Sequence, residues 1–257
     1  MSIRNIVIAV SAAALMAATG CASSNTPSLL KQAEAGKNLA EAYMQEGKTR
    51  AALRELEKAQ TQNPQDPEIY FDMGTVYLAL EEPQLAIQAL SRALKLNPDY
   101  AVAKNTLGSA YITVEQWDKA IPLFQELSEN LIYATPQYPL LNLGYIYYRK
   151  GDYLKSTQCY LKAIDYSADF AQAWRGLGRT YLSMGKTKDA IIALEKAVSL
   201  APRFEWAYLD LGDALEQAGR VSEAVADWKK VGALAPTSDA AKEAEARLAR
   251  YSQSGGE

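Results

Sequence analysis

The stretch LGRTYLSMGKTKDAIIALEKAVSLAP, residues 177–202, contains the pattern that decides the fold. Small residues stand at Gly178 and Ala190, and the large Leu194 follows the alanine by four positions. Small residues at two such positions let two helices approach closely, while leucines and aromatic rings fill the space between them. Gly185, between the two halves, suits the left-handed conformation that ends a helix. The stretch therefore predicts a helix–turn–helix unit.

The same unit occurs six times along the chain. The column of Gly178 recurs at gaps of 34, 34, 36, 34 and 34 residues and is filled by Ala40, Gly74, Gly108, Gly144, Gly178 and Gly212. The column of Leu194 is filled by Leu56, Leu90, Phe124, Tyr160, Leu194 and Trp228. This spacing is similar to that of the tetratricopeptide repeat, and the resemblance implies an all-α, right-handed superhelical solenoid of six repeats. A generic helical bundle is the alternative interpretation.

The repeat columns also set the expected domain organisation. We place the repeats at 33–66, 67–100, 101–134, 137–170, 171–204 and 205–238. Residues 239–252 are expected to form a C-terminal capping helix, because an open-ended solenoid needs a polar last face, and 253–257 to form a frayed tail. Thr135 and Pro136 are a two-residue insertion between repeats three and four. The insertion either changes the local superhelical turn or reflects neutral drift in an exposed turn.

The first twenty residues differ from the rest of the chain. From Ile6 to Ala18 they are almost wholly apolar, a length that is short for a membrane span and typical of a signal peptide. The segment closes with ATGC at Cys21, which resembles a bacterial lipoprotein signal. That resemblance implies a signal peptide over 1–20 and attachment to a membrane through lipid on Cys21. An ordinary secretory signal and a short membrane anchor are the alternatives. Residues 21–32 are expected to be a polar tether.

The composition argues against catalysis and against several classes of ligand. The chain of 257 residues has a formal net charge of −3, which gives no electrostatic reason to expect nucleic acid. It has no histidine, the commonest general base and metal ligand. Two cysteines without histidine cannot form an ordinary zinc site. We therefore expect a protein that is not an enzyme and has no metal, cofactor or small-molecule substrate, and a structural role for Cys159.

Repeat solenoids bind partners on the concave surface formed by the first helix of each repeat. In the general family pattern, positions 2, 5, 9, 12 and 13 of each repeat face inward. From these positions we select as candidate partner-binding residues Phe71, Leu78, Asn105, Ile112, Tyr138, Leu141, Tyr145, Tyr148, Arg149, Arg175, Arg179 and Trp206. Tyrosine and tryptophan are typical of interface hot spots, although some of these side chains are expected to pack between neighbouring helices. The mixture favours an extended or amphipathic protein segment as ligand.

Residues 115–164 resemble one particular family of repeat proteins. Within them, Leu131–Gly144 carries a lengthened junction before the letters NLG. Together with the lipoprotein signal, this junction is similar to the type IV pilus biogenesis and stability lipoproteins, the pilotins of the PilF/PilW and Tgl kind. The resemblance implies an outer-membrane lipoprotein that faces the periplasm and helps the pilus secretin to reach the outer membrane and assemble into its multimeric pore.

A second function is compatible with the same lipid and the same repeats. The chain could serve as an envelope adaptor that recruits peptidoglycan enzymes or other assembly proteins. The sequence leaves both functions open, and it does not specify the partner segment or the oligomeric state.

Overall fold

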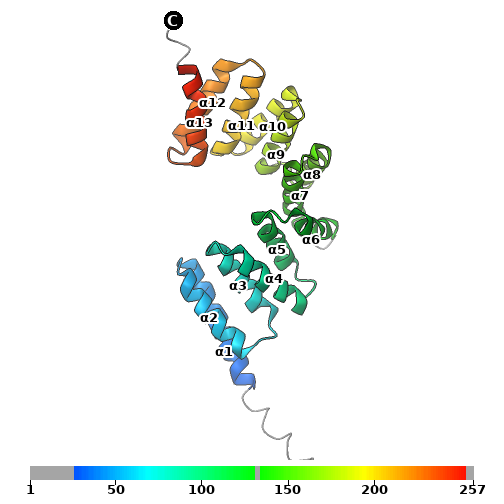
Figure 1. Ribbon diagram of the computed structural model, residues 1–257, viewed down its shortest axis with the longest axis vertical. Helices are drawn as coiled ribbons and strands as arrows, with labels where there is room; N and C mark the ends of the chain where they lie inside the picture. The colour runs from blue at the N-terminus through cyan, green and yellow to red at the C-terminus, as the bar shows by residue number, and fades with distance from the viewer. Residues whose placement is uncertain (1–25, 131–133, 253–257) are drawn as a thin grey trace, which may run out of the picture. The chain divides into compact units, whose positions relative to one another are not determined.

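The computed structural model describes residues 26–130 and 134–252, and in these ranges every regular element is a helix (Figure 1). The described residues form thirteen helices, which confirms the predicted all-α repeat fold. The predicted signal peptide, Cys21, residues 131–133 of the junction and the predicted tail 253–257 lie outside the described residues.

The chain divides into two compact units, one up to Thr106 and one from Leu107. The first unit contains α1 (Thr26–Gln45), α2 (Thr49–Gln62), α3 (Pro67–Ala79), α4 (Pro83–Leu96) and the start of α5 (Ala101–Thr113). The second contains the rest of α5, α6 (Trp117–Glu129), α7 (Gln137–Arg149), α8 (Tyr153–Tyr166), α9 (Ala171–Ser183), α10 (Thr187–Leu200), α11 (Glu205–Gln217), α12 (Val221–Leu234) and α13 (Asp239–Ser252). Odd-numbered helices up to α11 are the first, or A, helices of the repeats, even-numbered ones are the B helices, and α13 is the cap.

Helix α1 begins earlier than the sequence suggests. The predicted tether 21–32 is wrong from Thr26 onward, because α1 already begins there. Pro27 is compatible with the first turn of a helix, where the backbone N–H groups have no intrahelical acceptor. Gln32 accepts a hydrogen bond of 3.3 Å from Gln62 of α2, and Ala33 is buried. Packing against α2 therefore begins close to the first turns of α1.

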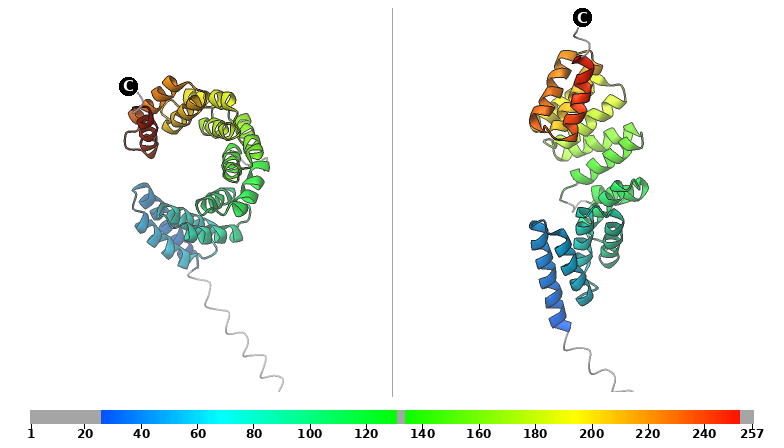
Figure 2. Two further views of the ribbon diagram at one scale, coloured as in Figure 1. Left: turned by 45° about the horizontal axis from the view of Figure 1, so that its top comes forward. Right: turned by 60° about the vertical axis from the view of Figure 1, so that its left-hand side comes forward.

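Each A helix from α3 onward approaches the B helix of its own repeat at a glycine. A Cβ atom built on Gly108 would lie only 2.5 Å from the ring of Phe124, sixteen residues later. The same sixteen-residue pairing joins Gly74 to Leu90, Gly144 to Tyr160, Gly178 to Leu194 and Gly212 to Trp228. Because all five large side chains are buried, the two columns found in the sequence are the two sides of one repeated contact. Figure 2 shows the resulting helix pairs of the second unit packed side by side.

The turn between the A and B helices uses a residue with positive φ. Four repeats place a glycine there, with φ between 72° and 78°: Gly47, Gly151, Gly185 and Gly219. Repeats two and three place Glu81 and Glu115 there instead, with φ of 61° and 56°. A side chain makes this conformation unfavourable by about 1–2 kcal/mol. The next N–H group offsets part of this cost in both turns, because it donates a 2.9 Å hydrogen bond back to the A helix.

The inserted residues Thr135 and Pro136 lie directly before α7, and Pro136 is the N-cap of that helix. The carbonyl of Thr135 accepts a hydrogen bond from the N–H of Tyr138, and that of Pro136 accepts one from Leu140, both at 3.3 Å. Pro136 has helical dihedral angles of −64° and −16°. Both inserted residues are half-buried. The insertion is therefore part of the helical packing of repeat four.

The ring of Tyr160 is larger than most of its counterparts and requires a second glycine. A Cβ atom on Gly176, in the next A helix, would clash with the Tyr160 ring and hydroxyl. Two buried hydroxyl groups line the same region: Ser156 donates to the carbonyl of Gly144 at 2.9 Å, and Thr180 donates to that of Gly176 at 2.8 Å. The two hydroxyl oxygens lie 3.0 Å apart. Repeat four is thus adapted locally to a tyrosine.

We expect Gly176→Ala to destabilise the second unit, because the added methyl group must displace the buried Tyr160 ring. Overpacking of this kind costs about 1–3 kcal/mol and lowers Tm by several degrees. Gly232→Ala in α12 is the matched control, since none of the described residues lies within 4 Å of the added Cβ. Alanine is also the better helix former, so the Tm of this control should stay the same or rise. Equal melting of the two variants, followed by circular dichroism, would contradict the packing argument.

Candidate partner-binding surface

The twelve predicted partner-binding residues all lie on A helices, divided between the two units. Phe71 and Leu78 lie on α3, and Asn105 lies on the part of α5 that belongs to the first unit. All three are half-buried. The Phe71 ring packs against Tyr100 with centroids 5.2 Å apart. The other nine residues lie in the second unit, where they fall into three groups.

The first group contributes to packing as well as to the surface. Ile112 and Leu141 are half-buried against the core that contains Phe124. Tyr138 remains 48% exposed and sets its ring edge-on to Phe170 at 5.3 Å. Only Tyr138 in this group therefore offers a largely free side chain.

The second group surrounds Arg149 at the end of α7. Arg149 donates a 2.7 Å hydrogen bond to the hydroxyl of Tyr145 and forms a 3.0 Å ion pair with Glu115. Its guanidinium group also lies over the rings of Trp117 and Tyr145, at 5.4 and 5.8 Å from their centroids. Arg149 is thus held on several sides, and this group presents aromatic surface rather than a free cation.

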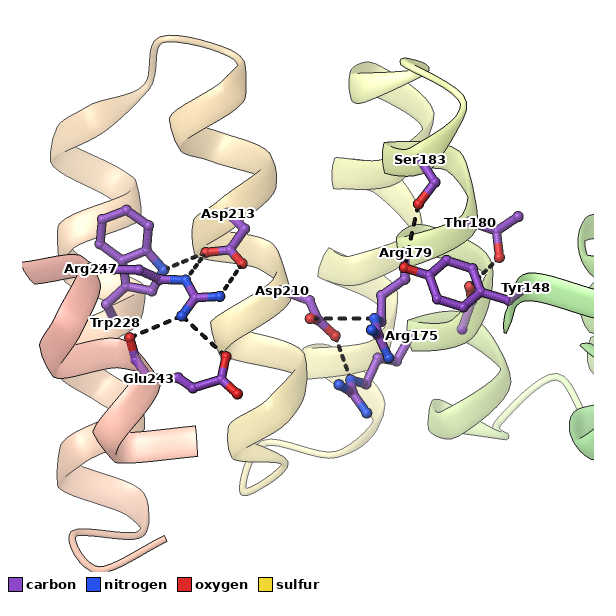
Figure 3. Close-up of polar contacts among 11 residues, drawn as sticks. Tyr148, Arg175, Arg179, Thr180, Ser183, Asp210, Asp213, Trp228, Glu243 and Arg247 are labelled. Atoms are coloured by element: carbon purple, nitrogen blue, oxygen red, sulfur yellow. Dashed lines mark hydrogen bonds and ion pairs between the residues drawn. The ribbon is translucent and has the colours of Figure 1, made fainter. Parts of the chain in front are cut away.

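The third group is centred on a buried carboxylate that two arginines share (Figure 3). Arg175 and Arg179 lie one turn apart on α9, and both approach Asp210 of α11, with Nε–Oδ distances of 2.5 and 3.7 Å. Asp210 is only 8% exposed. Burial raises the pKa of its carboxyl, while the two guanidinium groups act in the opposite direction.

Aromatic rings hold the same two arginines in place. Arg175 lies over the rings of Phe204 and Trp206, at 5.5 and 5.4 Å from their centroids. Arg179 lies over the ring of Tyr148 at 5.0 Å. Planar guanidinium groups stack on aromatic faces in this way and keep their edges for hydrogen bonds. Both arginines are therefore fixed in orientation before any partner arrives.

These residues line one cleft, which we call the α9–α11 cleft. Its volume is about 270 Å³. It is lined by Tyr148, Arg175, Arg179, Leu182, Ser183, Trp206, Leu209, Asp210, Asp213, Glu243 and Arg247. The structure therefore brings together four of the twelve predicted residues, Tyr148, Arg175, Arg179 and Trp206.

The cap supplies the other charged wall of the α9–α11 cleft. Arg247 of α13 binds Asp213 through two hydrogen bonds of 2.5 and 2.9 Å, and also pairs with Glu243 at 3.2 Å. The indole N–H of Trp228 donates to Asp213 at 3.2 Å. Asp210 and Asp213 thus lie on the same helix but face opposite neighbours, α9 and α13 (Figure 3).

Asp210, Glu243 and Arg247 are not among the residues predicted from the sequence. For Asp210 the sequence does hold a signal, because an acid interrupts the apolar run YLDLG at 208–212. Asp72 occupies the same column in YFDMG at 70–74. In both cases a cation stands 35 residues earlier, Arg175 before Asp210 and Lys37 before Asp72. An acid in this column with a cation in the preceding repeat would have indicated an ionic contact between A helices.

Asp72 is the counterpart of Asp210 in the first unit. Burial raises the pKa of its carboxyl to about 6, with Lys37 acting against that rise and Glu68, Glu41 and Asp66 adding to it. Lys37 itself forms an ion pair with Glu68 and lies 3.7 Å from Asp66. Because Lys37 interacts with several carboxylates, its attraction for Asp72 does not offset the effect of burial on the pKa of Asp72.

The described part of the chain also bears on metal binding, membrane spanning and thiol chemistry. No group of three or more His, Cys, Asp or Glu residues there is arranged to hold a metal ion. Nor does any helix in residues 26–130 and 134–252 have the length and apolar character to cross a membrane. Cys159 is half-buried, and burial raises the pKa of its thiol to about 11. The thiol is therefore protonated at neutral pH and weakly nucleophilic.

Protein-family models match the repeats of this chain. Tetratricopeptide repeat models match residues 37–101, 77–131 and 181–248, and a further TPR repeat model matches 144–185. The chain belongs to the tetratricopeptide repeat family.

Two curated relatives share part of their length with this chain. It is 29% identical to the BBSome complex member BBS4 of Bos taurus over 142 residues, 54% of this chain and 26% of that protein. It is 25% identical to the peroxisomal targeting signal receptor of Pichia angusta over 202 residues, 63% of this chain and 34% of that protein. The chain thus spans a quarter to a third of the length of these relatives.

Two solved tetratricopeptide repeat structures match over nearly their whole length. PilW, a widely conserved type IV pilus biogenesis factor, superposes with a TM-score of 0.75 at 21% identity, covering 84% of this chain and 98% of that one. Pseudomonas aeruginosa pilF superposes with a TM-score of 0.71 at 17% identity, covering 86% and 99%. At these identities the likeness establishes the fold.

We expect Asp210→Ala to destabilise the second unit by about 2 kcal/mol, because it leaves Arg175 and Arg179 beside a buried space without their shared hydrogen-bond acceptor. The unfolding midpoint in urea measures this change. Asp239→Ala is the matched control, since its side chain is 79% exposed and pairs with Lys242, which is 71% exposed. Exposed pairs of this kind contribute about 0–1 kcal/mol. Equal midpoints for the two variants would show that Asp210 does not organise the arginines.

Asp72→Asn should change the pH dependence of stability. A carboxyl whose pKa is higher in the folded chain binds its proton more tightly there, so its contribution to stability is complete below about pH 4. That contribution is lost as the pH rises through about 6, the folded pKa of Asp72. The variant should therefore be more stable than the wild type at neutral pH, on the order of 1 kcal/mol.

The difference between Asp72→Asn and the wild type should shrink toward pH ~4, where both side chains are neutral. Urea unfolding at several pH values measures it. Asp99→Asn, at an exposed turn position, provides the control. A difference that does not vary with pH would contradict the assigned burial of the Asp72 charge.

Proposed function

We propose that this tetratricopeptide repeat protein is an outer-membrane lipoprotein that faces the periplasm and binds the type IV pilus secretin. In this role it promotes the outer-membrane localisation of the secretin or its assembly into multimers. The observation that carries the proposal is the likeness in fold to PilW and to Pseudomonas aeruginosa pilF, which extends over 98% and 99% of those chains. A match over nearly whole chains favours a shared role more than a match of a few repeats would.

The start of the sequence supports the location. An apolar segment that closes with ATGC at Cys21 suits export followed by attachment of lipid. A lipid anchor would hold the repeats at the membrane surface, which is where a secretin must be inserted. The anchor then supplies location, and the repeats supply recognition.

The surface of the second unit suits binding rather than bond-making chemistry. Its A helices present tyrosine, tryptophan and arginine side chains that already have fixed contacts, such as Arg179 on Tyr148. Large rigid side chains of this kind bind with a small loss of conformational entropy. Such a surface can hold a segment of an unassembled secretin subunit while other subunits join it.

Deletion of the gene should remove the detergent-resistant secretin multimer from outer-membrane fractions while secretin monomer persists. Immunoblots of fractionated cells measure both species. The intact gene should restore the multimer. Cys21→Ser should move the repeat protein from the membrane fraction to the soluble fraction and restore less multimer, because recognition is retained but location is lost.

Unchanged multimer in the deletion strain would contradict the secretin role. An adaptor that recruits peptidoglycan enzymes or other assembly proteins would then be the remaining function. Persistence of Cys21→Ser in the membrane fraction would show instead that another segment anchors the protein.

A further inference from the structure

The charges of the α9–α11 cleft are balanced as a whole but not at each end. On the α9 side, Arg175 and Arg179 share the single carboxylate of Asp210, which leaves a formal charge of +1. On the α13 side, Arg247 faces both Asp213 and Glu243, which leaves −1. Figure 3 shows the two groups on opposite sides of α11. The cleft is therefore positive at one end and negative at the other.

Helices α7 and α9 supply no carboxylate to the positive end. The described helices α7 and α9 contain three arginines and no aspartate or glutamate. Arg149, the third of these arginines, already pairs with Glu115. The excess positive charge therefore stays with Arg175 and Arg179.

Arg179 is the arginine that a ligand can reach. The Arg175 side chain is 20% exposed, lies against two rings and approaches Asp210 to 2.5 Å. The Arg179 side chain is 36% exposed and its Nε stays 3.7 Å from Asp210. The ring of Tyr148 covers one face of its guanidinium group, which leaves the edge to donate two parallel hydrogen bonds to a carboxylate.

Apolar side chains also line the cleft between its two charged ends. Leu182, Trp206 and Leu209 line the cleft together with the ring of Tyr148. The volume of about 270 Å³ is below the roughly 300–1,000 Å³ that is usual for small-molecule sites. The cleft therefore has room for the side chains of a peptide rather than for a whole cofactor.

We propose that the α9–α11 cleft binds an internal peptide segment in which a large apolar residue stands between an acidic and a basic residue. The carboxylate binds Arg179, the apolar side chain packs on the partly exposed Trp206 and Leu182, and the cation faces Glu243. A segment of uniform charge meets repulsion at one end, so the two ends together provide specificity. A chain terminus supplies one charged group of its own, whereas the cleft has one positive and one negative end. An internal segment with an acidic and a basic side chain therefore fits better.

This inference rests on the proposed function only for the identity of the partner, and its test uses no secretin. Detergent-solubilised full-length protein is immobilised and used to select from a random dodecapeptide library displayed on phage. The peptides are fused through their C-termini, so each carboxylate comes from a side chain. Compared with the unselected library, the recovered peptides should be enriched in Asp or Glu on one side of a large apolar residue and in Lys or Arg on the other.

Single substitutions should remove each half of this pattern separately. Selection on Arg179→Gln should lose the acidic enrichment and keep the basic one, and selection on Glu243→Gln should do the reverse. Arg203→Gln, at an exposed turn position before α11, is the matched control and should keep both. Arg179→Lys should keep the acidic enrichment with weaker binding, because it retains the charge without the planar fork. Melting curves check that each variant is folded.

Synthetic pairs of recovered peptides then measure the contribution of the carboxylate. In fluorescence polarisation, replacing the acid with its amide should weaken binding to the wild type about tenfold or more and should have little effect on Arg179→Gln. Recovery of no peptides above background, enrichment without a charge pattern, or an unchanged acid preference in Arg179→Gln would each overturn the proposal. If secretin multimer is lost in the deletion strain but the selected peptides show no charge pattern, only the proposal for the cleft is refuted. If the selected peptides show the charge pattern but the deletion strain keeps its secretin multimer, only the secretin role is refuted.

Discussion

Every other feature of this protein depends on the close approach of the A and B helices within each repeat. A glycine removes the Cβ atom that would hold the helices apart, and a large side chain sixteen residues later fills the space, as Trp228 does against Gly212. This contact uses one face of the A helix and leaves another for neighbouring repeats and partners. Where the large side chain is a tyrosine, the next repeat also gives up its Cβ atom, at Gly176.

The fixed repeat length places residues 34 or 35 positions apart opposite one another, on adjacent A helices or on the last A helix and the cap. Polar contacts at this separation join Arg175 to Asp210, Asp213 to Arg247 and Tyr148 to Ser183. The net contribution of such contacts to stability is small, because the loss of hydration of the charged groups opposes their attraction. Their main effect here is to fix the orientation of long side chains on the A-helix surface. The repeat spacing thus determines the geometry of the candidate site.

The sequence predicts the repeats well because the spacing of small and large residues records the helix contact directly, as at Gly178 and Leu194. It misplaces the start of α1, because the polar composition of 21–32 hides a helix that packing on α2 stabilises. For the site, the inward positions include Arg175 and Arg179, which line one cleft in the structure, but omit Asp210, which stands in a column used for packing. Arg247 lies in the cap, which the sequence predicts only as a polar last face, so its pairing with Asp213 is missed although the two residues stand 34 positions apart, one repeat length.

Asp210 explains why these arginines suit recognition. A free arginine loses about 1.5–2 kcal/mol of side-chain entropy when it becomes fixed, whereas Asp210, Trp206 and Tyr148 fix Arg175 and Arg179 during folding. The cost is a buried carboxylate whose pKa burial raises, and the two cations offset part of it. One carboxylate is enough to orient both arginines but not to neutralise them. A second carboxylate at this position would satisfy Arg179 within the protein and remove the reason for a ligand to bind there.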